Sequence, residues 1–151
     1  LHLLDLASGR MTPVGDHKKA IAWGDAEFAP DGTLWATSDE GSDVQRLGTV
    51  DLASGRFTPR GPSSRWDVDS FEISRDGRLI AFVTNEAGIA RLSLMDVASG
   101  AVRRVEGLPA GQIGGLEFAP WGALGFSVNS AKSPTDAFSL DPATLAVTRW
   151  T

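Results

Sequence analysis

The sequence has no cysteine, and its 151 residues include two histidines. Without cysteine the chain can form no disulfide, no thiolate metal site and no cysteine nucleophile, and its redox compartment stays open. It also has no run of about 18 apolar residues, so no membrane-spanning helix is expected. The chain does not start with the basic and then apolar pattern of a signal peptide. We therefore expect a soluble protein, with the cytoplasm slightly preferred as its compartment.

Positive charge is scarce as well. Lysine and arginine together number 14 against 19 acidic residues, which gives a net charge of −5 and a pI near 4.9. The adjacent basic residues Lys18-Lys19 and Arg103-Arg104 are isolated pairs and form no basic run. A protein that binds phosphates needs a surplus of Lys and Arg on one face. We therefore expect neither nucleic acid nor a membrane among its partners.

Motifs for catalysis and metal binding are missing too. The segment closest to a nucleophile elbow is 125–129, Gly-Phe-Ser-Val-Asn, which lacks the closing glycine. His2 falls in an apparent strand and His17 in a polar stretch between repeats, and a surface or loop position explains both. The segment 67–72, Asp-Val-Asp-Ser-Phe-Glu, resembles a calcium loop superficially, without the glycine and ligand spacing such loops need. The sequence therefore predicts no catalytic residue, no metal site and no cofactor.

What the sequence does contain is an internal repeat. Two landmarks recur about every 45 residues, and from Ala22 onward three copies align without a gap. A repeat of this kind decides the architecture before any single residue does. The first landmark is an Asp-x-Ala-Ser/Thr element that begins at Asp5, Asp51, Asp96 and Asp141. The second is an apolar residue followed by a turn with glycine, and it begins at Phe28, Ile73 and Phe118.

A period near 45 residues with four short β-like runs per copy is typical of propeller blades. In the middle copy the runs are 68–74, 79–84, 90–97 and 101–105, separated by turn residues. The second run is almost entirely apolar, as expected for a strand covered on both faces. The fourth contains Pro13 or Pro59 in two copies, which suits an outer edge. The predicted fold class is all-β, with WD-like blades of four antiparallel strands.

The repeat also predicts how the chain is divided. Residues 20–61, 65–107 and 113–151 make three full blades, and residues 1–14 make the last two strands of another. Closed propellers have about 4–8 blades, so three and a half blades leave the ring incomplete. Arrays of repeats normally cap or continue their end faces. We therefore expect the chain to be cut from a longer protein or to assemble with a second copy.

Three repeated carboxylates carry a functional hypothesis. Glu27, Glu72 and Glu117 occupy the same position in each copy, just before the apolar residue of the innermost strand. Because innermost strands line a propeller's channel, the carboxylates could form a partial ring that favours a cation or the amino group of a peptide substrate. The alternative is that each faces channel water or pairs with an arginine of the next blade, such as Arg46 or Arg91.

Segments 66–74, 79–86 and 141–151 resemble the propeller of prolyl oligopeptidase family serine peptidases, in the dipeptidyl aminopeptidase and acylaminoacyl peptidase branch. Similar blades occur in the Tol translocation propeller and in other WD-like proteins, and the Trp66 and 149–151 segments favour the peptidases. The chain departs from the family pattern at three turn positions, which suggests relaxed turns in the same fold. These positions are Arg75 in place of Pro, Trp121 in place of Asp and Pro142 in place of an aliphatic residue.

In that family the propeller caps an α/β-hydrolase domain that follows it, and it limits the size of substrates. The resemblance implies that the catalytic Ser, Asp and His would lie beyond Thr151. The chain is then a non-catalytic fragment that gates the access of peptides and scaffolds the hydrolase domain. Its partners would be that domain and the missing blades. The alternative is a stand-alone interaction module that assembles by oligomerisation, with a second copy as its partner.

Overall fold

The computed structural model describes residues 1–15 and 19–151, so His17 lies outside the described residues. The described residues form antiparallel strands, and none of them belongs to a helix that could cross a membrane. The strands are β1 (His2–Leu4), β2 (Met11–Pro13), β3 (Trp23–Phe28), β4 (Leu34–Ser38), β5 (Arg46–Val50), β6 (Phe57–Pro59), β7 (Val68–Ile73), β8 (Leu79–Glu86), β9 (Ile89–Asp96), β10 (Val102–Arg104), β11 (Gln112–Phe118), β12 (Leu124–Ser130), β13 (Ser133–Leu140) and β14 (Val147–Arg149).

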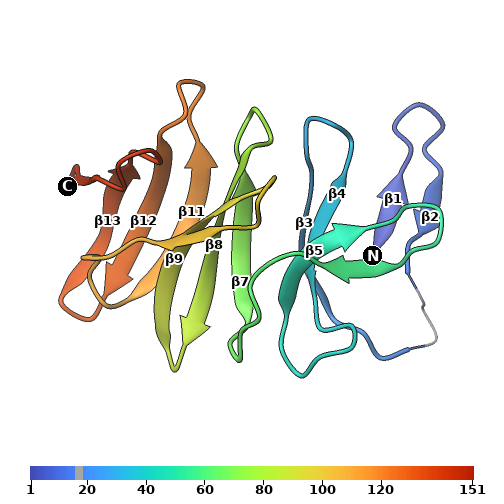
Figure 1. The fold of residues 1–151 in the computed structure, drawn as a ribbon, viewed down its shortest axis with the longest axis horizontal. Coiled ribbons are helices and arrows are strands. Elements are labelled where there is room, and N and C mark those ends of the chain that lie inside the picture. The colour runs from blue at the N-terminus through green and yellow to red at the C-terminus, as the bar shows by residue number, and fades with distance from the viewer. Residues whose placement is uncertain (16–18) are drawn as a thin grey trace.

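The strands gather into one two-stranded sheet and three four-stranded sheets, which follow one another in chain order. We call β3–β6 the first blade, β7–β10 the middle blade and β11–β14 the third blade. Figure 1 shows them side by side as a fan, with the β1–β2 sheet next to the first blade. Strand β7 contacts both β3 and β11, so these three strands form the inner edge of the fan. The predicted fold class is therefore confirmed: four-stranded antiparallel blades arranged as part of a ring.

The apolar core lies between the sheets, because each blade is only one strand layer thick. One cluster joins the first and middle blades through Trp35, Leu47, Ile80 and Phe82, among others. A larger cluster joins the middle and third blades, and a smaller one joins the β1–β2 sheet to the first blade. Burial of apolar area is the main favourable term in folding. Each blade therefore depends on its neighbours for stability.

The middle blade departs from the register that the gap-free sequence alignment predicts. Its first hairpin holds one extra residue, because the Ser74 hydroxyl accepts the N–H of Leu79 (2.9 Å) and donates to Asp76 (2.7 Å). A shift of one residue moves side chains to the opposite face of a strand. The alignment is therefore wrong for β8 by one position. The corresponding strand pairs are Phe28–Leu34, Ile73–Ile80 and Phe118–Leu124.

The repeated aspartates form turns between the third and fourth strands of each blade. In the first blade the Asp51 carboxylate accepts the N–H of Ser54 at 2.7 Å, and Gly55 follows with φ 69°. This turn needs a residue at positive φ, which glycine adopts without strain. In the third blade Leu145 stands at the position of the glycine, with φ 61°.

Two glycines at this turn position provide a matched test of the packing between blades. Gly100 and Gly55 have φ 71° and 69°, but an added Cβ would meet no atom within 4 Å at Gly100 and would lie 2.5 Å from the Gly15 nitrogen at Gly55. We expect Gly100→Ala to lower the free energy of unfolding by about 1–2 kcal/mol through backbone strain alone. Gly55→Ala should cost clearly more. Urea denaturation measures both, and equal losses would contradict the close contact at Gly15.

Candidate functional site

The candidate carboxylates lie on the three innermost strands, and Glu27 and Glu72 are on the face that points to the following blade. Directly opposite residues of an antiparallel pair share one face of the sheet. Trp35 and Ala81, the partners of the first two carboxylates, are buried in the interfaces with the following blade. The three cross-strand pairs are Glu27–Trp35, Glu72–Ala81 and Glu117–Gly125.

Two of the carboxylates bind the backbone of the next blade. The Glu27 Oε2 atom accepts the N–H of Ile73 at 3.1 Å. The N–H of Phe118 has the equivalent place at the Glu72 carboxylate and lowers its pKa, as a backbone hydrogen bond does. Ile73 and Phe118 are the residues that directly follow Glu72 and Glu117 in the chain. The same contact between a glutamate and the following blade's backbone therefore recurs with one repeat as its period.

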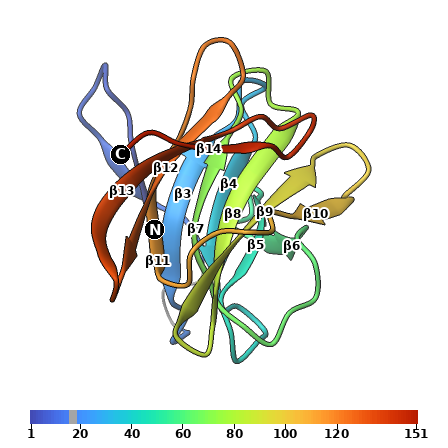
Figure 2. The same cartoon turned by 90° about the vertical axis from the view of Figure 1, so that its left-hand side faces the viewer.

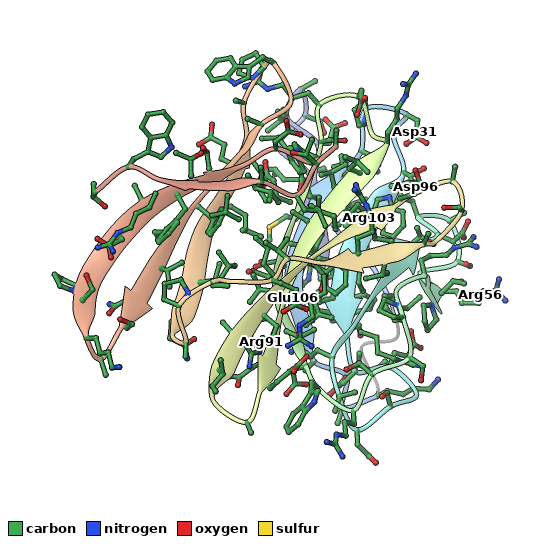
Figure 3. All side chains as sticks on the ribbon, turned by 60° about the vertical axis from the view of Figure 1, so that its left-hand side comes forward. Asp31, Arg56, Arg91, Asp96, Arg103 and Glu106 are labelled. Carbon is green, nitrogen blue, oxygen red and sulfur yellow. The ribbon has the colours of Figure 1, made fainter. Side chains whose placement is uncertain are left out.

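The arginines considered as alternative partners have other contacts. Arg46 donates to the Glu40 carbonyl at 2.7 Å. Arg91, labelled in Figure 3, lies 3.9 Å from the Glu86 carboxylate on its own blade. The structure thus reveals an inter-blade hydrogen bond that sequence reasoning missed. The exact 45-residue spacing of a glutamate beside an apolar residue was the available signal, but it does not tell which backbone group the carboxylate meets.

The electrostatics of the three carboxylates follow from this placement. Burial raises the pKa of Glu27, and the N–H of Ile73 partly opposes that shift. Burial also raises the pKa of Glu72, with smaller contributions in the same direction from the negative charges of Glu27 and Glu117. The carboxylates are therefore near enough to influence one another. Whether they bind a cation or an amino group stays a prediction.

The segment that resembles a calcium loop has a structural role in part. The Asp67 carboxylate accepts the N–H of Gln45 at 2.7 Å, which ties the middle blade to the first. Burial raises the pKa of Asp69, and the neighbouring Asp67 charge adds to that effect. Within residues 1–15 and 19–151, no three His, Cys, Asp or Glu side chains gather in a way that could hold a metal ion.

A groove of about 920 Å³ lies between the middle and third blades, lined in part by Arg103 and Trp121. Arg103 crosses it and donates to the carbonyls of Pro142 (2.6 Å) and Ala143 (3.2 Å). Figure 3 labels Arg103 on the middle blade. Because the guanidinium donates to these carbonyls, it holds the third blade's outer turn against the middle blade. Trp121 stays 82% exposed beside the groove.

Comparison with known proteins places the fold. No protein-family model matches the chain, and no curated protein matches it. Solved structures do match: TolB from Acinetobacter baumannii has a TM-score of 0.75 at 20% identity, over 99% of this chain and 37% of that one.

Two peptidase structures also match. A prolyl endopeptidase from a structural and mechanistic study of two such enzymes has a TM-score of 0.71 at 17% identity, over 87% of this chain and 20% of that one. Porphyromonas gingivalis dipeptidyl peptidase 4 has a TM-score of 0.64 at 19% identity, over 82% of this chain and 17% of that one. These likenesses establish a propeller fold. The chain spans well under half the length of each of the three structures.

Substitutions at Glu72 test the inter-blade hydrogen bond. Glu72→Ala leaves the N–H of Phe118 without its acceptor, and we expect the free energy of unfolding to fall by about 1–2 kcal/mol. Glu72→Gln keeps a side-chain oxygen at the same place and should lose much less. Chemical denaturation of both variants at neutral pH gives the comparison. Equal losses for the two variants would show that the acceptor oxygen does not matter.

The raised pKa of Glu72 gives a stability difference that depends on pH. The folded-state pKa lies above the unfolded value of about 4.3, so the contribution of this group is fully present below that pH. It is lost as the pH rises through the folded-state pKa. We therefore expect the wild type to lose stability relative to Glu72→Gln as the pH rises from about 4 to 7. Denaturation midpoints across that range measure it, and a constant or opposite difference contradicts the burial argument.

Proposed function

We propose that the chain is a non-catalytic segment of a peptidase propeller, which gates the access of peptides and scaffolds an α/β-hydrolase domain. The observation that carries this proposal is the incomplete ring. Its blades pack as in a propeller, and they match parts of the longer prolyl endopeptidase and dipeptidyl peptidase 4 chains. A ring of rigid blades around a channel excludes large substrates by size, and the channel then admits short peptides.

In this role the inner edge of the fan lines the passage. Strand β7 lies there between β3 and β11, and each of the three strands contributes one carboxylate. A peptide with a free amino terminus carries a positive charge that a row of carboxylates attracts. Glu117 is the exposed member of the three within the described residues. Glu27 and Glu72 would act mainly by holding the blades together.

A second candidate is a stand-alone interaction module that assembles by oligomerisation. The open side of the third blade favours it, because Trp150 is 70% exposed there. Light scattering during size-exclusion chromatography separates the two candidates. A stable closed oligomer of this chain supports the module, whereas an unstable or aggregating monomer supports the peptidase segment.

The coding sequence beyond Thr151 provides the direct test of the leading candidate. We expect it to encode the remaining blades or the hydrolase domain, with a serine in a Gly-x-Ser-x-Gly elbow on a strand-to-helix turn. An enzyme assay on the full-length product with aminoacyl and peptidyl chromogenic substrates should then show hydrolysis. A gene that encodes no hydrolase domain would contradict the peptidase proposal and leave the interaction module.

A further inference from the structure

The third blade covers one face of the middle blade. The outward face of the third blade has no such blade over it among the described residues. Figure 2 shows the molecule from this side. Along β12 and β13 the alternate residues Phe126 and Phe138 are buried against the middle blade. The residues between them point the other way, because successive side chains of a strand alternate. We call this surface the open face, and it consists of Glu117, Gly125, Ser127, Ala137, Ser139 and Trp150.

The open face repeats a surface that is buried elsewhere in the chain. The strand register shows which residues of the middle blade are equivalent to those of the open face. Five of these equivalent residues are covered by the third blade and are 0–4% exposed. On the open face Ala137 is exposed and Ser127 is half-buried. The five buried counterparts are Ala81, Val83, Leu92, Leu94 and Val105.

Trp150 provides the sharpest contrast in burial. The backbone N–H of Trp150 donates to the Ala137 carbonyl. In the same way the backbone N–H of Val105 donates to the Leu92 carbonyl, and that of Val14 donates to the Leu1 carbonyl. These three residues therefore stand at one and the same position of a blade. Val14 and Val105 are 3% and 4% exposed, whereas Trp150 is 70% exposed.

Glu117 provides a second and independent contrast. Glu27 and Glu72 are half-buried and accept an N–H from the following blade. Glu117 is exposed, and its carboxylate meets no hydrogen-bond donor within the described part of the chain. The open face thus combines an unused acceptor with an exposed indole at positions where the inner blades have a bonded acceptor and a buried valine.

The open face also carries smaller side chains than the equivalent face of the middle blade. Gly125 and Ala137 stand where the middle blade has Ala81 and Leu92. Since interiors pack to a nearly constant density, the surface that covers Gly125 and Ala137 needs large side chains. Phe126 is a side chain of this kind at the existing interface.

We propose that the open face docks a further four-stranded blade, whose innermost strand donates a backbone N–H to the Glu117 carboxylate. The second strand of that blade places bulky apolar side chains over Gly125 and Ala137, beside Trp150. The interface continues one that the chain already contains between its own blades. The proposal goes beyond the proposed function, because it holds whether the added blade belongs to a peptidase or to another propeller.

Within the described residues a complete four-stranded blade brings its innermost strand to the glutamate of the preceding blade, as the middle and third blades do. We therefore assign the open face to a complete blade.

An extended protein tests this assignment. A second copy of residues 107–151, one full repeat, is joined after Thr151 so that its β11 can reach the first Glu117. In this protein Glu117→Ala should lower Tm by about 2–8 °C, as loss of one buried acceptor does in a chain of this size. In the unextended chain the same substitution should leave Tm within about 1 °C, because no N–H is lost. Glu117→Gln is the matched control and should keep Tm in both proteins, since it retains an acceptor oxygen.

Two results would overturn the proposal. The first is a Glu117→Ala shift that is the same in the extended and unextended proteins, or an added repeat whose amides exchange at the unfolded rate. The second is a dimer of the unextended chain in which Trp150 is protected from acrylamide quenching. That dimer would assign the open face to a second copy.

Discussion

The contact between neighbouring blades is the constraint on which the rest of the structure depends. A single four-stranded sheet has two faces to cover, and in this chain the cover comes from the next sheet along. Apolar burial supplies most of the attraction, but it has no direction of its own. The carboxylate of Glu27 and that of Glu72 add a directional bond that sets one blade against the next at the inner edge. Both faces of β8 are buried for this reason.

The same contact explains where large apolar side chains stay exposed at the two outer blades. Ile73 and Phe118 are 4% and 2% exposed, whereas Phe28, at the same position of the first blade, is 51% exposed. The β1–β2 sheet covers the outer part of the first blade and leaves the inner part open. At the other end Trp150 and Glu117 lie uncovered. The function proposed here is architectural for this reason, since what the chain offers to a partner is mainly its blade faces and its inner edge.

The blades and their turns could be predicted from the sequence, because a repeat shows the same structural requirement at several places in the chain. The Asp-x-Ala-Ser-Gly turns need a side-chain acceptor and a positive φ, and both demands are local. The face of β8 could not be predicted, because the hairpin in which the Ser74 hydroxyl accepts the N–H of Leu79 holds one extra residue although the repeat length stays the same. The partner of Glu27 could not be predicted either. It is a backbone N–H 46 residues away, and the sequence does not indicate which backbone group a side chain meets because nearly every residue has the same one.

Amide hydrogen exchange at three equivalent positions tests the central claim most directly. The N–H groups of Ile73 and Phe118 are bound by the carboxylate of the preceding blade, and that of Phe28 has no such carboxylate before it within the described residues. Residue-resolved exchange of the intact chain should therefore show slow exchange at Ile73 and Phe118 and fast exchange at Phe28. Equal rates at all three positions would contradict the account, because the bond between blades would then give no protection.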